Sequence, residues 1–84
     1  MLIKTQSNLC VVSFEKMHSI SIEENNEKIF IVAKSEIGKY ILGQYSSLNI
    51  AKRVLDNLLR DYKEMYFDTE NDYWYVIYEM PQYQ

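Results

Sequence analysis

Residues 39–59, KYILGQYSSLNIAKRVLDNLL, mark the point where the hydrophobic period of the chain changes. Through Tyr45 the segment is rich in β-branched and aromatic residues, as is typical of a strand. After Ser46, a residue type that caps helix N-termini, apolar side chains recur every three or four residues. They are Ala51, Val54, Leu55, Leu58, Leu59, Tyr62 and Met65. The segment therefore predicts a strand followed by an amphipathic surface helix of about five turns.

Further strands are predicted on both sides of this point. Runs rich in β-branched and aromatic residues predict strands at 9–14, 19–24, 28–34 and 39–45, an additional edge strand at 2–5 and a final strand at 73–80. Asn25-Asn26 predicts a two-residue hairpin turn, because asparagine tolerates positive φ. Gly38 predicts a second turn, as its left-handed residue. Pro81 ends the last strand because proline has no N–H to donate.

The predicted order is β-β-β-β-(β)-α-β, which belongs to the α+β class. We expect one antiparallel sheet of about five to six strands with one long helix packed on one face. The chain has two glycines, one proline and no repeats, hence no candidate linker, so residues 1–84 are expected to form a single α+β domain. Apolar residues at 48% and charged residues at 25% argue against wholesale disorder.

Large apolar residues occupy both faces of the final predicted strand. Trp74, Val76, Tyr78 and Met80 point one way, and Tyr73, Tyr75, Ile77 and Glu79 the other. Phe30 and Val32 oppose Ile29 and Ile31 in the same manner. One helix covers one sheet face, so the second face is partly exposed, curls on itself, or meets a second copy or a partner; we favour the last two. The candidate interface or ligand-binding residues are Tyr73, Tyr75, Ile77, Tyr78 and Trp74, with a plain core or a base-stacking pocket as the alternatives.

The polar arc of the helix carries several cations. Arg53, Arg60 and Lys63 are possible phosphate contacts. Asp56 and Glu64 share this arc, which favours a solvated, salt-bridged surface. The net charge of −3 argues against a protein dedicated to binding duplex nucleic acid.

Recognisable catalytic and metal-binding patterns are missing from the sequence. Cys10 is the single cysteine and excludes an internal disulfide, and with His18 it is too little for a zinc site. The acidic loop at residues 68–72 resembles part of an EF-hand, but Tyr73 stands where that loop needs glycine. Neither a GxGxxG motif nor a P-loop is present. We therefore predict no enzyme, no catalytic residue, no metal and no cofactor.

Membrane and secretion signals are also missing from the sequence. The first residues, MLIKTQSNLCVV, lack a basic start followed by a long apolar run, so no signal peptide is expected. No window approaches the roughly 18 apolar residues of a membrane span. We expect a cytoplasmic protein that does not contact membranes.

Several segments together resemble a group of short, functionally uncharacterised proteins from phages and mobile elements of low-GC Gram-positive bacteria. They are MLIKTQ, VVSFEKMHSISIEE, YILGQYSSLNIAKRVLDNL and the terminal YVIYEMP. The likeness covers nearly the whole chain, and each of its motifs also fits a turn, a cap or a core position. The resemblance implies a genomic setting and not an activity.

These observations lead to a small non-enzymatic binding protein of phage or mobile-element origin. The resemblance makes a counter-defence protein the best interpretation, one that inhibits a host immune protein or sequesters a nucleotide second messenger in the host cytoplasm. The alternative is a structural or regulatory accessory protein that forms a homo-oligomer through its aromatic sheet face. A third, hydrolytic possibility rests only on the acidic loop.

Overall fold

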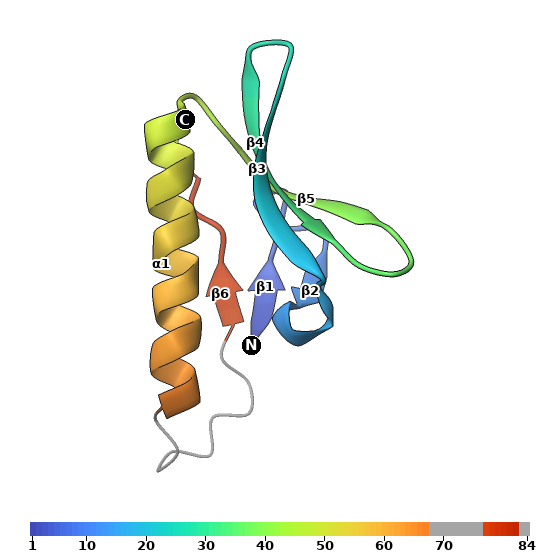
Figure 1. Ribbon diagram of the computed structural model, residues 1–84, viewed down its shortest axis with the longest axis vertical. Helices are drawn as coiled ribbons and strands as arrows, with labels where there is room; N and C mark the ends of the chain where they lie inside the picture. Colours follow the sequence, from blue (N-terminus) through green and yellow to red (C-terminus); the bar gives the residue numbers. More distant parts are fainter. Residues whose placement is uncertain (68–76, 83–84) are drawn as a thin grey trace.

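The computed structural model describes residues 1–67 and 77–82. In chain order the elements are β1 (Leu2–Lys4), β2 (Val11–Ser13), the short 3-10 helix η1 (Phe14–Lys16), β3 (Ser19–Asn25), β4 (Lys28–Lys34), β5 (Lys39–Tyr45), α1 (Leu48–Phe67) and β6 (Ile77–Glu79). Figure 1 shows α1 running along one side of the molecule, with the strands beside it. The predicted α+β class is confirmed.

The prediction of a single antiparallel sheet is wrong, because the strands form two three-stranded sheets. Their orders are β2-β1-β6 and β3-β4-β5. β1 was expected at an edge, yet it lies in the centre of its sheet, antiparallel to β2 and parallel to β6. Because β2 and β6 occupy both edges of β1, β5 cannot pair with it. The Gln6 N–H donates to the Leu42 carbonyl oxygen at 2.8 Å, which is one of the bonds that join the two sheets.

The β3–β4 hairpin turns one residue later than predicted. Asn26 and Glu27 both have positive φ, 53° and 66°, and Asn25 pairs with Lys28. Two positive φ values are typical of the type I′ turn, whose twist matches that of the strands. This register places Ile29, Ile31 and Ala33 in the core.

The β4–β5 turn does not use a left-handed glycine, because Gly38 has no positive φ. Ser35 forms the turn instead: its N–H donates to the Gly38 carbonyl oxygen at 2.8 Å, and its hydroxyl accepts from the Ile37 N–H at 3.3 Å. Further along β5, Ile31 pairs with Gly43 while Val32 pairs with Ile41, so Leu42 is an extra residue in a bulge.

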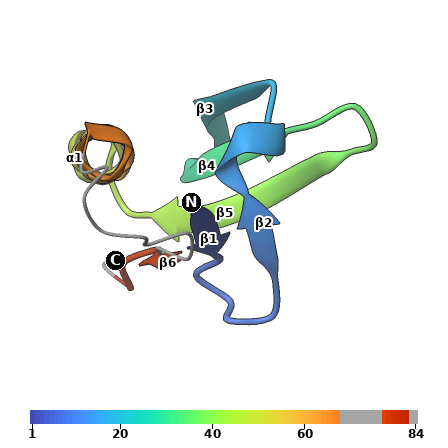
Figure 2. The same cartoon turned by 90° about the horizontal axis from the view of Figure 1, so that it is seen from below.

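The helix begins one residue later than predicted, with Ser47 as its cap in place of Ser46. The Ile50 N–H donates to the Ser47 hydroxyl at 3.1 Å. Ala51, Val54 and Leu58 are fully buried, as the helical period predicted. Seen from below in Figure 2, α1 lies to one side of the β3-β4-β5 sheet, against which its apolar face packs.

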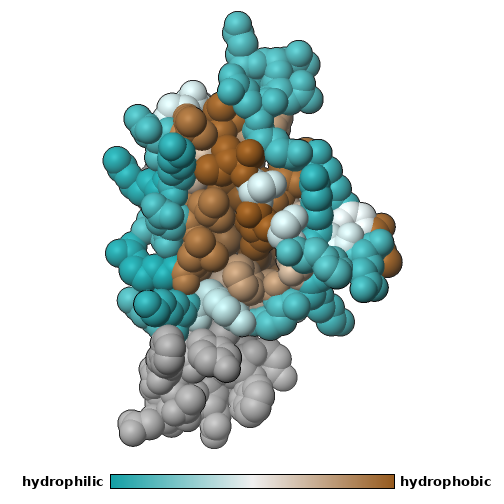
Figure 3. All heavy atoms as spheres, in the orientation of Figure 1, coloured by the Kyte–Doolittle hydropathy of each residue, from teal (hydrophilic) through white to brown (hydrophobic). Residues whose placement is uncertain are grey.

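The core draws side chains from both sheets and from α1. Its buried members are Met1, Ile3, Val12, Ile29, Ile31, Ala33, Leu42, Tyr45, Ala51, Val54, Leu58, Tyr78 and Met80. Figure 3 shows apolar atoms along the middle of one face, between α1 and the β3–β4 hairpin, with hydrophilic atoms on both margins. A strip of apolar surface therefore remains visible beside the core.

The outer face of the β3-β4-β5 sheet is partly covered by its own side chains. Val32 alternates with the core residues of β4 but is only 1% exposed. At the same face Glu23 lies 2.9 Å from the Lys39 ammonium and 3.9 Å from that of Lys34. The hydrogen bond from Lys39 lowers the pKa of Glu23, against a smaller opposing effect of burial and with help from the charge of Lys34. Val32 is therefore covered from within the chain.

Candidate functional site

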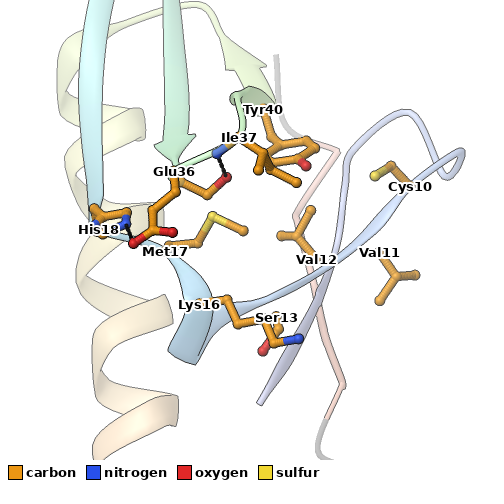
Figure 4. Close-up of a pocket in the computed structure, with 11 residues that line it drawn as sticks. Cys10, Val11, Val12, Ser13, Lys16, Met17, His18, Glu36, Ile37 and Tyr40 are labelled. Carbon is orange, nitrogen blue, oxygen red and sulfur yellow. Dashed lines mark hydrogen bonds and ion pairs between the residues drawn. The ribbon is translucent and has the colours of Figure 1, made fainter.

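A groove lies between β2 and the β4–β5 turn, and we call it the edge groove. It is lined by Cys10, Val11, Val12, Ser13, Lys16, Met17, His18, Ser35, Glu36, Ile37 and Tyr40, and its volume is about 670 Å³. Figure 4 shows Val12, Met17, Ile37 and Tyr40 gathered about the same space, between the β2 backbone and the turn. The two walls thus come from different sheets.

Local sequence explains why apolar side chains remain at this groove. The turn made by Ser35 places Ile37 at its tip, where the side chain is 89% exposed. Strand alternation buries Val12 in the core and leaves Val11 51% exposed. Cys10 is half-buried between the core and the groove.

Among the strands that the structure describes, none hydrogen-bonds to the side of β2 that faces away from β1. The Thr5 N–H donates to the Cys10 carbonyl oxygen, and the Phe14 N–H donates to that of Met1. In an antiparallel ladder the residues between such pairs direct their backbone groups to the opposite side. The N–H and C=O of Val11 and the N–H of Ser13 therefore point away from β1, and no residue in the described ranges hydrogen-bonds to them. The Ser13 C=O belongs to the start of η1, of which Ser13 is the N-cap.

The charged side chains at the groove differ in whether they have an ion-pair partner. His18 Nε2 lies 3.7 Å from Glu36 Oε1, whereas Lys16 makes no ion pair within residues 1–67 and 77–82. The neighbouring carboxylate, Glu15, lies 2.6 Å from the Met1 ammonium. Burial works to raise the pKa of Glu15, but hydrogen bonds from that ammonium, from its own backbone and from the Ser13 hydroxyl together lower it. Because Glu15 is held by Met1, Lys16 remains available to an anionic group.

The predicted interface residues of the final strand do not form one surface in the part that the structure describes. Ile77 is 54% exposed, but Tyr78 is buried in the core and offers little area to a partner. Strand alternation is the reason, since β6 turns Tyr78 toward the core and Ile77 away from it. Tyr73, Trp74 and Tyr75 lie outside the described residues, as does the acidic loop at 68–72.

The predicted phosphate contacts lie on the exposed side of α1. Arg53 and Arg60 border a shallow surface that also includes the Asp56 carboxylate, and the Arg60 guanidinium donates to the Asn57 side-chain oxygen. Lys63 is exposed but does not border this surface. With an acid among its lining residues, the surface is not a uniformly basic site.

Sequence reasoning did not find the edge groove. Its one visible signal was Ile37, a large apolar residue in the turn SEIG, where polar residues are usual. His18 is exposed and lies immediately before β3.

Across the described residues, no group of three or more His, Cys, Asp or Glu side chains is placed to hold a metal ion. In the same part of the chain, no helix combines the length and apolar character that crossing a membrane requires. Comparisons with protein-family models, curated proteins and solved structures gave no match.

Proposed function

We propose that this protein is a small non-enzymatic binding protein that acts by binding its partner and blocking it, with the edge groove as the contact surface. The observation that supports this most is the combination of an apolar groove of about 670 Å³ with a strand edge whose backbone groups have no described partner. Concave apolar sites with a few polar groups at defined positions are the usual form of binding sites.

The resemblance noted in the sequence supports a setting in phages or mobile elements. In that setting we propose a counter-defence role in the host cytoplasm, with a host immune protein as the partner. Inhibition of a protein has more support than sequestration of a nucleotide messenger. The groove walls carry aliphatic side chains, whereas Arg53 and Arg60 share their surface with Asp56.

A matched pair of variants tests the groove. Ile37 and Leu9 are both aliphatic and both 89% exposed, but only Ile37 lines the groove. Wild type, Ile37→Asp and Leu9→Asp would be expressed with an affinity tag in a low-GC Gram-positive host, and co-purifying proteins quantified by mass spectrometry. A candidate partner is then purified and titrated against all three.

We expect Ile37→Asp to weaken binding of that partner about 30-fold or more, since an aliphatic contact is replaced by a buried charge. Leu9→Asp is expected to change it by less than about threefold. Equal binding by both variants would exclude the edge groove as the contact surface.

A homo-oligomeric accessory protein is the second candidate. Ile77 is exposed beside half-buried Leu2, its register partner in β1, on the outer face of the β2-β1-β6 sheet. An apolar pair of this kind suits a contact between copies. Light scattering tests this candidate: a dimer that Ile77→Asp converts to a monomer supports it, and a wild-type monomer at about 100 μM excludes it.

A further inference from the structure

The backbone of β2 offers hydrogen bonds on the side that faces the edge groove. Val11 and Ser13 together present two N–H groups and the Val11 C=O away from β1. An extended polypeptide can satisfy such a row by adding to the sheet as a further strand. We propose that the edge groove receives an extended, apolar segment of a partner protein, which adds to β2 and places an acidic residue at Lys16. This proposal deepens the proposed function and rests on it.

The other strand edges are less suited to this role. β3 carries the adjacent charges Glu23 and Glu24, and charged side chains discourage pairing at an edge. The edge of β5 is engaged at Gln44, whose N–H donates to the Gln6 side chain at 2.8 Å. Pro81, which has no N–H to donate, closely follows β6. β2 has neither a charged side chain nor a proline within its range.

The groove beside β2 suits the side chains of an added strand. Alternate residues of a strand project to the same side. Those on the groove side would meet Val12, Met17 and Ile37, which favour aliphatic residues. The intervening residues would face outward and need not be apolar. The expected segment therefore has aliphatic residues at every second position.

Charge defines one end of the segment. Lys16 lines the groove just beyond the end of β2 and makes no ion pair with a described residue, while Glu15 is held by the Met1 ammonium. A carboxylate on the added strand at this end would give Lys16 a partner of opposite sign. The segment is thus apolar and acidic, with its acidic residue at the η1 end of β2.

A second copy of the chain does not supply that carboxylate. A symmetric β2–β2 pairing must join the outward groups of Val11 and Ser13 to the same groups of the copy. In the three registers that do so, Lys16 lies opposite position 6, 8 or 10, occupied by Gln6, Asn8 and Cys10. None of these residues is acidic, so the charge favours a different polypeptide.

Two synthetic peptides of seven residues provide the probe. Both alternate valine with threonine and have blocked ends, and they carry a single aspartate at either the first or the last position, because the strand can add in either direction. Cys10 is the only cysteine and lines the groove, so its alkylation rate reports occupancy without any label. One peptide is expected to slow alkylation by about fivefold or more at saturation.

Three substitutions separate strand addition from general stickiness. Ser13 has φ −88° and its N–H is not used by β1, so Ser13→Pro fits the strand and removes one outward donor. Ser13→Pro should lower the affinity for the peptide about tenfold or more, whereas Ser13→Ala should leave that affinity unchanged. Lys16→Glu should lower the affinity for the peptide about tenfold. Lys28 lies at the β3–β4 turn, so Lys28→Glu should change that affinity only a little.

A peptide methylated on alternate backbone nitrogens repeats the test without altering the protein. It should fail to protect Cys10, because its strand-pairing donors are gone. Absence of protection by both unmethylated peptides at about 1 mM would overturn the proposal. Protection of Cys10 that survives both Ser13→Pro and peptide methylation would overturn strand addition. The role of the groove as the contact surface is tested separately, by the comparison of Ile37→Asp with Leu9→Asp.

Discussion

Gln6 connects the two sheets and the C-terminal segment through its side chain. Its Oε1 accepts from the Gln44 N–H at 2.8 Å, and its Nε2 donates to the carbonyl oxygens of Gln44 at 3.1 Å and of Pro81 at 3.0 Å. The amide thus pairs with the β5 backbone as a neighbouring strand would. Removing it should separate elements that the backbone alone joins weakly.

The expected loss follows from these three contacts. Each neutral hydrogen bond contributes a net of about 0.5–1.5 kcal/mol, and partial exposure places these toward the lower half of that range. Gln6→Ala should therefore lower the free energy of unfolding by about 2 kcal/mol, which for a chain of this size lowers Tm by about 10 °C.

Gln6→Glu gives a sharper test, because it keeps the acceptor and replaces the donor. At pH 7 its carboxylate would face two carbonyl oxygens, so the loss should exceed that of Gln6→Ala and reach about 3 kcal/mol. These oxygens raise the pKa of the introduced carboxyl in the folded state. The excess loss is therefore present at neutral pH and disappears as the pH falls through that raised pKa, when the protonated acid can donate.

Urea unfolding followed by circular dichroism at pH 7 and pH 4 measures both variants. Gln82→Ala serves as the control, because its side chain is exposed and donates a single bond to the Gln6 carbonyl oxygen. Gln82→Ala should lower the free energy of unfolding by less than about 0.5 kcal/mol. A Gln6→Ala protein as stable as this control, or a Gln6→Glu protein as stable as wild type at pH 7, would refute the role assigned to Gln6.

Three further perturbations test the turns, the bulge and the surface charges. Gly43→Ala would place its Cβ 2.8 Å from the hydroxyl oxygen of buried Tyr45 and should cost about 1–3 kcal/mol in thermal unfolding, while Gly38→Ala meets nothing within 4 Å and should be near neutral. Glu27→Gly relieves a positive φ of 66° and should raise stability by about 0.5–1 kcal/mol in the same assay. The lowered pKa of Glu23 adds stability that is complete above its unfolded pKa and is lost as the pH falls through the lower folded value; Tm should drop below about pH 4.5, and drop less in Glu23→Gln.

The elements that the sequence predicted well are those set by local periodicity. The apolar spacing of Ala51, Val54 and Leu58 predicted the buried face of α1, and all three are fully buried. Strand alternation likewise predicted that Tyr78 and Ile77 face opposite ways. The predicted helix cap, Ser46, and the predicted first turn residue, Asn25, were each wrong by one residue. In both cases the next residue is of the same type, Ser47 or Asn26, and takes that position.

The division into two sheets depends on contacts that no local pattern contains. A run of three strand-like residues at Leu2–Lys4 has the same appearance whether it lies at an edge or between β2 and β6. Its parallel partner, β6, follows it by more than seventy residues. The glutamine that joins the sheets is also inconspicuous, because glutamine is common in surface loops and only its position opposite Gln44 gives it this role.

The same division explains why the candidate site was missed and how it depends on the fold. Two sheets of three strands have four edges where one sheet of six would have two, and the edge groove lies at one of the additional edges. One wall is β2 of the first sheet, and the other is the turn that begins β5 of the second. Gln6 lies where β1, which holds β2, approaches β5. We therefore expect a substitution at Gln6 to weaken binding at the groove as well as to lower stability, because Gln6 joins the two sheets that supply the groove walls.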